Sequence, residues 1–287
     1  MHAVAPDLRY RPWSRRSLVS TALTAASAAA FAIALLPLVS VLASIVRRGA
    51  ESWQWSMIWE LPPTANEGLG GFAGALVGTA VMVGLALLLA APIGVAAGVW
   101  LSEFGRGSRS ASVVRFAAKS LAGLPSVLAG AVAYVLVIVT FKSFHPLAGA
   151  VALALLMLPT IALQTEQALS MLPSGLREAA LAAGATDWQT AWRVTLPTAF
   201  PGIMTGMLLA AARGAGETAP LLFTALFSPI VMRDLREPAA SLSVQIFNFA
   251  GVPYANQQAN AWSTALALVV FVLSLNIAGR ALARRRS

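Results

Sequence analysis

Residues 172–201, LPSGLREAALAAGATDWQTAWRVTLPTAFP, separate two long apolar runs, and this stretch decides how the chain folds. Pro173-Ser174 can begin a helix, with Ser174 as its N-cap residue. Gly184 is placed to end that helix in a left-handed turn, which glycine enters without strain. The first half of the stretch therefore predicts one short helix that stops at Gly184.

The second half of the stretch predicts another helix. Thr186 and Gln189 fit a capping box at its start, and we expect Leu196-Pro197 to close it. The result is a compact, weakly charged hairpin of two short helices at an angle. Its small-residue face consists of Ala179, Ala180 and Ala183. A rigid hairpin of this kind suits insertion into a groove on another protein.

The composition on either side of the stretch is that of a membrane protein. The 287 residues are 58% hydrophobic and 11% charged, whereas an average soluble domain is about 25% charged. Six runs reach the length of about 20 mostly apolar residues that a bilayer-crossing helix needs. They are residues 17–46, 72–101, 121–140, 147–169, 201–227 and 261–281. We therefore expect an all-α integral membrane protein with six transmembrane helices.

The first apolar run has a second interpretation as a signal peptide. Ser14-Arg15-Arg16 ahead of the run, with Ala-Ser-Ala at 26–28, resembles a twin-arginine signal. The apolar core of a signal peptide is about 7–15 residues long, and this run is about twice that length, so a membrane span is favoured. The following loop contains three tryptophans that we expect to anchor it at the membrane interface, namely Trp53, Trp55 and Trp59.

The basic residues are distributed unevenly along the chain. It has 20 Lys and Arg against 11 Asp and Glu, a net charge of +9. If the N-terminus is inside, 14 basic residues fall in inner segments and 5 in outer ones, which places both termini in the cytoplasm. Contact of the basic inner segments with anionic membrane lipid then accounts for the net positive charge, so nucleic-acid binding is not needed to explain it. We expect an N-terminal tail, span and outer loop (1–71), a main membrane domain (72–281) and a basic cytoplasmic tail (282–287).

Several kinds of chemistry are excluded by the residues present. The chain has no cysteine, and its two histidines, His2 and His145, are far apart, so we expect neither a disulfide nor a metal site. The phosphate-binding pattern G-x-x-x-x-G-K-[ST] does not occur. Because no His–carboxylate or paired-carboxylate constellation is found either, we expect a non-catalytic protein without a cofactor.

Charged residues inside the fifth apolar run point to a functional site. Arg213 lies about 18 Å along a helix from Pro201, near mid-bilayer, where an unpaired charge costs about 2.5–3.5 kcal/mol or more. Glu217, four residues on, lies on the same face of such a helix and can pair with it. The pair is either a structural link between helices or an anion site on a transport path, where the guanidinium binds an oxyanion. Thr218 would donate one further hydrogen bond.

The spacing of the central stretch resembles a known motif. It matches the EAA-x3-G-x9-I-x-LP motif of bacterial ABC-importer permeases, with valine in place of isoleucine. The matching residues are Glu178, Ala179, Ala180, Gly184, Val194, Leu196 and Pro197. The resemblance implies the type I ABC importer permease fold, with the 178–197 segment docking in a cleft of an ATPase subunit.

Three further stretches narrow the resemblance. Residues 211–225, AARGAGETAPLLFTA, are similar to the fifth span of phosphate-specific permeases of the PstA type, and residues 91–104 and 121–126 resemble the same family. The resemblance covers about residues 72–281. It implies half of the translocation path of an ATP-driven phosphate importer in the bacterial inner membrane. The implied partners are a second permease (PstC type), a dimer of cytoplasmic ATPases (PstB type) and an external phosphate-binding protein.

The sequence departs from this family at one place and leaves two alternatives open. Relatives carry an arginine before an acidic run near the end of the fourth span, where this chain has residues 163–167, LQTEQ. A second cationic contact is therefore in doubt. The alternatives are a permease for another oxyanion, such as sulfate, molybdate or a phosphonate, and an ion-coupled secondary transporter that works without ATP.

Overall fold

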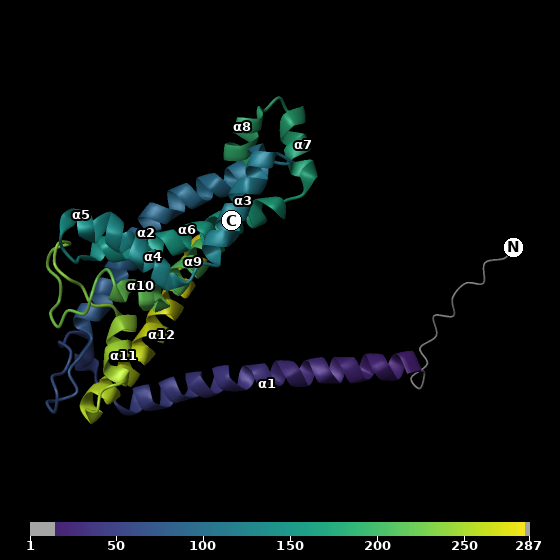
Figure 1. Ribbon diagram of the computed structural model, residues 1–287. Coiled ribbons are helices and arrows are strands. Elements are labelled where there is room, and N and C mark those ends of the chain that lie inside the picture. The colour runs from purple at the N-terminus through teal and green to yellow at the C-terminus, as the bar shows by residue number, and fades with distance from the viewer. Residues whose placement is uncertain (1–14, 285–287) are drawn as a thin grey trace. The chain divides into compact units, whose positions relative to one another are not determined.

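The structure, a computed structural model, describes residues 15–284, and this part of the chain is helical and contains no β-strand (Figure 1). The elements in chain order are α1 (Arg15–Glu51), η1 (Trp55–Ile58), α2 (Ala73–Val99), η2 (Trp100–Phe104), α3 (Arg109–Ala122), α4 (Ser126–Ala133), η3 (Tyr134–Ile138), α5 (Val139–Phe141), α6 (Pro146–Ser170), α7 (Ser174–Ala182), α8 (Asp187–Thr190), η4 (Ala191–Thr195), α9 (Leu196–Gly216), α10 (Ala219–Leu222), α11 (Leu242–Ala250) and α12 (Ala255–Arg284). The chain divides into two compact units, Met1–Arg47 and Arg48–Ser287.

The first unit contains most of α1, a continuous helix of 37 residues that is apolar enough to cross a membrane. This helix is longer than the apolar core of a signal peptide, about 7–15 residues, and so favours a membrane span. The basic residues expected at 9 and 11 and the end of the basic tail, 285–287, lie outside the described residues. The expected division into 1–71, 72–281 and 282–287 stays a prediction.

The second unit is built around α2 and α6, which lie side by side at very short distance. A β-carbon placed on Gly98 of α2 would lie 2.5 Å from the β-carbon of Thr165 in α6, and one on Gly94 would lie 2.9 Å from that of Ile161. Close backbone approach through small residues is how helices associate where lipid removes the hydrophobic drive between them. The core beside this contact contains Met82, Ala86, Leu153, Met157, Ala210 and Ala211.

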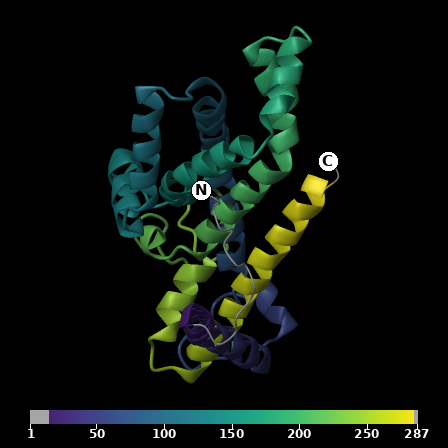
Figure 2. The ribbon, with the colours of Figure 1, turned by 90° about the vertical axis from the view of Figure 1, so that its right-hand side faces the viewer.

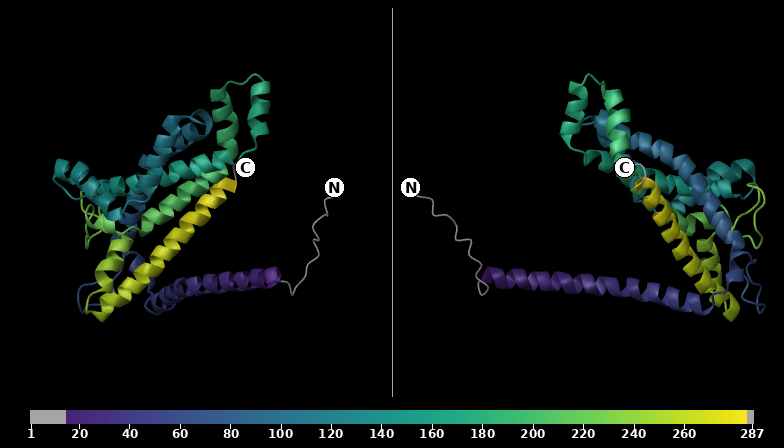
Figure 3. Two further views of the ribbon diagram at one scale, coloured as in Figure 1. Left: turned by 45° about the vertical axis from the view of Figure 1, so that its right-hand side comes forward. Right: turned by 180° about the vertical axis from the view of Figure 1, so that it is seen from behind.

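Helix α9 packs on a neighbouring face of α6 in the same way and also contacts α2. A β-carbon on Gly206 would lie 2.5 Å from the β-carbon of Gln164, and one on Gly202 would lie 2.9 Å from that of Ala168. Helices α7 and α8 form a hairpin at one end of the second unit, and α11 lies toward the opposite end (Figures 2 and 3). The hairpin and α11 therefore mark the two ends of the α2–α6–α9 core.

The third predicted span is wrong at its inner end. Residues 121–122 belong to α3, and the helix pair 109–122 and 126–141 is bent by 99° at the short break between them. Pro125 explains the break, because its ring disfavours helical geometry in the residue before it. Within residues 15–284, five helices are long and apolar enough to span a membrane, and this bent pair would make a sixth.

The fifth predicted span, 201–227, is wrong at both ends. The helix runs continuously from Asp187 through η4 to Gly216, so Leu196-Pro197 does not close the second helix of the hairpin as expected. Pro197 lies inside this continuous helix, directly after the π-helical turn η4, where the regular i→i−4 hydrogen bonding is already interrupted. At the other end the backbone turns to an extended conformation at Glu217.

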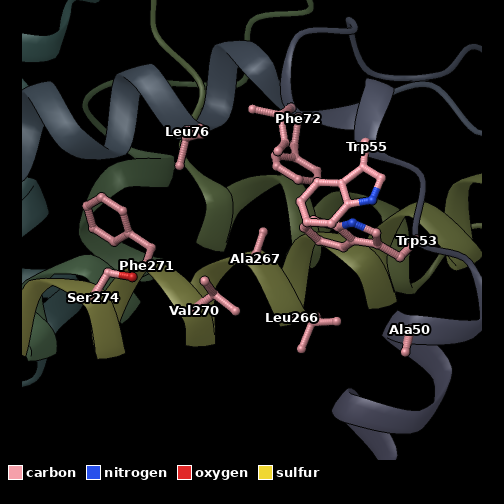
Figure 4. A pocket seen from close by; sticks show the side chains of 11 residues that line it. Ala50, Trp53, Trp55, Phe72, Leu76, Leu266, Ala267, Val270, Phe271 and Ser274 are labelled. Carbon is pink, nitrogen blue, oxygen red and sulfur yellow. The ribbon is translucent and has the colours of Figure 1, made fainter. Parts of the chain in front are cut away.

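The tryptophan loop belongs to the second unit and packs against other parts of it. Trp53 lies with its ring 5.7 Å from that of Phe72 and 5.9 Å from that of Trp55, whereas Trp55 and Trp59 are largely exposed. The rings of Trp53, Trp55 and Phe72 border an apolar pocket of about 610 Å³, and Leu266, Val270 and Phe271 of α12 line its other side (Figure 4). Exposed indoles beside an apolar surface fit the expected anchoring at a membrane interface.

The close contact between α2 and α6 gives a testable prediction. Gly98→Ala places a methyl group 2.6 Å from the Ala162 carbonyl oxygen, and such overpacking costs about 1–3 kcal/mol. We expect a lower thermal unfolding midpoint in detergent. Gly84→Ala in the same helix meets nothing within 4 Å and is the matched control, since alanine favours a helix over glycine by about 1 kcal/mol. Equal midpoints for both variants would contradict the packing described.

Candidate functional site

The hairpin is closed by a glycine turn and a capping box, both as predicted. Gly184 has φ +87°, and the N–H groups of Gly184 and Ala185 donate to the carbonyls of Leu181 and Ala180 at 2.9 and 3.1 Å. The Thr186 hydroxyl accepts from the Gln189 N–H at 3.2 Å, and the Gln189 side chain accepts from the Thr186 N–H at 3.0 Å. These short-range bonds make the tip of the hairpin rigid.

The predicted start of the hairpin is wrong by one residue. The N-cap of α7 is Pro173, and Ser174 is the first helical residue. The ring of Pro173 fixes its φ at −56°, and with ψ at 138° the chain enters the helix from an extended conformation. Ser174 is therefore already helical and does not act as the capping side chain.

The seven motif residues of the hairpin differ in their exposure to solvent. Four are exposed, namely Glu178, Ala179, Gly184 and Pro197, and three are half-buried, namely Ala180, Val194 and Leu196. Leu196 packs against the apolar cluster that contains Leu169 and Ile203. The first half of the motif thus forms an accessible surface, and the end of the motif connects it to α9.

The base of the hairpin contains an ion pair that the sequence analysis did not find. Arg177 of α7 donates from Nη2 to Glu103 Oε1 at 2.7 Å and from Nε to Glu103 Oε2 at 3.0 Å. The Arg177 and Glu103 side chains are 13% and 7% exposed. The hydrogen bonds that Arg177 donates to the Glu103 carboxylate raise the pKa of Arg177, so the arginine stays charged. The available signal was an acidic residue at the end of an apolar run and an arginine in the hairpin, but they are 74 positions apart.

The other arm of the hairpin carries exposed aromatic side chains. Trp188 is 60% exposed, and its ring lies 6.0 Å from that of Phe104 and 5.3 Å from that of Trp192. Leu181 near the tip is also exposed. Large exposed apolar side chains that lie together in this way are typical of surfaces that contact a partner.

Arg213, Glu217 and Thr218 lie together at a break between two helices. Arg213 is in the last turn of α9, and Glu217 is the residue that ends this helix. Arg213 Nε lies 3.5 Å from Glu217 Oε1, so the two side chains meet, although Glu217 is not on the same helical face as expected. The half-buried Thr218 precedes α10. The helix end explains the site, because its free carbonyls favour a cation in the last turn.

The two members of this pair differ in exposure. The Arg213 side chain is 54% exposed, whereas that of Glu217 is 16% exposed. The backbone carbonyl of Glu217 accepts a hydrogen bond from the Ser243 hydroxyl at 2.8 Å, which ties the break to α11. Arg213 therefore offers an accessible guanidinium, and Glu217 is held in place beside it.

Two hollows of the second unit do not offer such chemistry. The pocket in Figure 4 and a groove between α2 and α9, bordered by Leu88, Pro92 and Met207, are lined almost wholly by apolar side chains. Among residues 15–284, no three His, Asp or Glu residues are arranged to hold a metal ion. A bundle of apolar helices long enough to cross a membrane, with a rigid hairpin and an accessible arginine at a helix break, defines a multi-span membrane protein.

Comparison with known proteins agrees with this class. The family described as "Binding-protein-dependent transport system inner membrane component" matches residues 90–287. A Yersinia pestis protein named "Phosphate transport system permease protein PstA" is 40% identical over 254 residues, which cover 88% of this chain and 86% of that protein. The Mycobacterium tuberculosis protein PstA 2 is 36% identical over 278 residues, covering 95% and 91%.

Solved structures share the fold at low identity. A bacterial alginate ABC transporter chain has a TM-score of 0.61 at 15% identity, with 96% of this chain and 98% of that chain covered. A chain of the MetNI methionine ABC transporter in an inward-facing conformation has a TM-score of 0.60 at 22% identity, with 82% and 100% covered. The predicted all-α, type I ABC importer permease fold is thereby confirmed.

The chain belongs to the binding-protein-dependent transport system inner membrane components and, among them, to the PstA-type permeases. It is therefore a multi-pass transport subunit of the inner membrane. Membership in this family implies three kinds of partner: a substrate-binding protein, a second permease and an ATPase.

Proposed function

We propose that the chain forms half of the translocation path of an ATP-driven importer of inorganic phosphate. The observation that carries this proposal is the identity of 35–41% with permeases named for phosphate transport, each matched over most of its length. We further propose that both termini lie in the cytoplasm. The second permease would be of the PstC type, and the ATPases, which alone would hydrolyse ATP, of the PstB type.

The hairpin is proposed as the part that docks in the ATPase. Its exposed residues Glu178, Ala179 and Gly184 form a small, rigid surface, and its second arm runs without interruption into α9. A displacement of the hairpin by ATP-driven closure of the ATPases would therefore tilt α9, whose far end carries Arg213. Binding and hydrolysis of ATP would in this way change the access to the path.

Arg213 is proposed as the phosphate-binding residue of the path. Its guanidinium can give two parallel hydrogen bonds to an oxyanion, and more than half of the side chain is accessible. Glu217 would hold Arg213 while the path is empty and release it to the incoming anion, and Thr218 would donate one further hydrogen bond. The 3.5 Å separation of the pair supports this role, because it is long for a charge-assisted bond and is easily exchanged.

Replacement of Arg213 tests the anion site. Arg213→Gln removes charge-assisted bonds worth about 1.5–3 kcal/mol, so we expect phosphate uptake by the complete importer in proteoliposomes to fall by about 10- to 100-fold. Arg280→Gln, at an exposed arginine of α12, is the control. Sulfate and molybdate as competitors check which anion is carried. Wild-type uptake by Arg213→Gln would contradict the assignment.

Glu217→Gln distinguishes an anion site from a structural ion pair. Removing a carboxylate that competes for Arg213 should leave the complex assembled and lower the KM for phosphate. If the pair only links helices, Arg213→Gln and Glu217→Gln should instead lower the thermal midpoint together, with the KM unchanged. The KM and the unfolding midpoint are measured on the same purified complex.

Replacement of Gly184 tests the docking role of the hairpin. A side chain at φ +87° is strained by about 1–2 kcal/mol, so Gly184→Leu should weaken co-purification with the ATPase by about 5- to 30-fold, while insertion of the spans is unaffected. Gly175→Leu is the matched control, because Gly175 lies in the same hairpin without a positive φ and with open space around it. Normal ATPase binding by Gly184→Leu would contradict the docking role.

A further inference from the structure

One of the three core helices, α2, is not directly continuous with the hairpin in the chain. Helix α6 leads into α7 through residues 171–173, and α8 continues through η4 into α9. Helix α2 and the turn η2 that ends it are far from the hairpin in the sequence. Any movement of the hairpin reaches α6 and α9 along the chain, but it reaches the end of α2 only through contacts in space, namely the packing of α2 on α6 and the side-chain contacts between η2 and the hairpin.

Both arms of the hairpin contact the turn η2, and they do so at neighbouring residues. Arg177 from the α7 arm forms the two-pronged ion pair with Glu103. Trp188 from the α8 arm lies with its ring 6.0 Å from that of Phe104. Glu103 and Phe104 are the last two residues of η2, so this single turn is held from both sides.

Arg177 also connects the hairpin to the end of α6. Its Nη2 donates to the Leu169 carbonyl at 2.8 Å and its Nη1 to the Leu172 carbonyl at 3.3 Å. The Leu169 carbonyl belongs to the last turn of α6, where a cation is favoured, and the Leu172 carbonyl lies in the connection just after it. The guanidinium is thereby fixed to α7, η2 and α6 at the same time, and its planar fork leaves little freedom of movement.

We propose that the Arg177–Glu103 pair is the mechanical link between the hairpin and α2, so that a movement of the hairpin displaces α2 together with α6. The inference rests on the proposed function of the hairpin as the ATPase docking element. Arg177 and Glu103 act as positioning residues: with the pair intact, a displacement of α7 carries the end of α2 with it, and the close α2–α6 contact is preserved. Without the pair, the hairpin still binds the ATPase, but α2 does not follow its movement.

A second ion pair of the same chemistry provides a matched control. Arg115 of α3 donates to Glu166 of α6 from Nη2 at 2.6 Å and from Nε at 2.9 Å, with side chains 33% and 17% exposed. This pair also joins an arginine and a glutamate that are far apart in the sequence, but both lie outside the hairpin. Its loss should leave the coupling between ATP hydrolysis and transport unchanged.

The test measures ATP hydrolysis and phosphate uptake in the same proteoliposomes, which contain the complete importer and its binding protein. For Glu103→Gln and Arg177→Gln we expect ATP hydrolysis to persist while the phosphate imported per ATP falls by about tenfold or more. Arg177→Lys keeps the charge without the fork and should give an intermediate ratio. Glu166→Gln should keep the wild-type ratio.

Two outcomes would contradict the proposal that the Arg177–Glu103 pair links the hairpin to α2. One is a wild-type ratio of phosphate to ATP in Glu103→Gln, and the other is a proportional loss of hydrolysis and uptake, which indicates a merely structural role. Either result leaves the proposed function intact provided that the wild-type hairpin binds the ATPase and the wild-type complex imports phosphate. Failure of these two wild-type controls would instead contradict the proposed function.

If the single variants do not assemble, a pair of engineered cysteines tests the proposed link between the hairpin and α2. The chain has no cysteine of its own, so Glu103→Cys with Arg177→Cys can be linked selectively by a short bis-maleimide. The covalent link replaces the ion pair, and we expect it to restore the ratio of phosphate to ATP that the unlinked double variant lacks. If the cross-linked protein still imports little phosphate per ATP hydrolysed, the proposed link between the hairpin and α2 is contradicted.

Discussion

The close approach of α2 and α6 is the constraint on which the second unit depends. Gly94 and Gly98 leave no room for side chains between the two backbones, and in lipid such direct contact is the main source of helix association. The same arrangement repeats on a neighbouring face of α6, where Gly202 and Gly206 admit α9. Helix α6 is thus in direct contact with both α2 and α9, and α9 carries the hairpin at one end and the exposed arginine at the other.

Features that depend on a few neighbouring residues could be predicted from the sequence. The left-handed turn at Gly184 and the capping box of Thr186 and Gln189 follow from local backbone chemistry. The apolar runs likewise indicated membrane helices, because the requirement for length and low charge is severe. Membership in the permease family could be recognised from the spacing of the hairpin residues alone.

Features that depend on three-dimensional packing could not be predicted. A count of apolar residues does not distinguish a straight span from one that bends at Pro125 or ends at Gly216, since the residues beyond these breaks are equally apolar. The helix end at Gly216 also changes the geometry of the candidate site, where Glu217 meets Arg213 from an extended segment. The partners Arg177 and Glu103 meet only because α2 and α6 place their ends side by side.

The π-helical turn η4 has a consequence for how this protein tolerates change in chain length. In an α-helix each residue advances the direction of the side chains by about 100°, and a π-turn accommodates one additional residue without breaking the helix. The turn at Ala191–Thr195 therefore sets the rotational phase between the hairpin and α9. Loss of one residue here would leave both helices intact and rotate Trp188 away from Phe104, so insertions and deletions in this stretch are constrained by angle rather than by length.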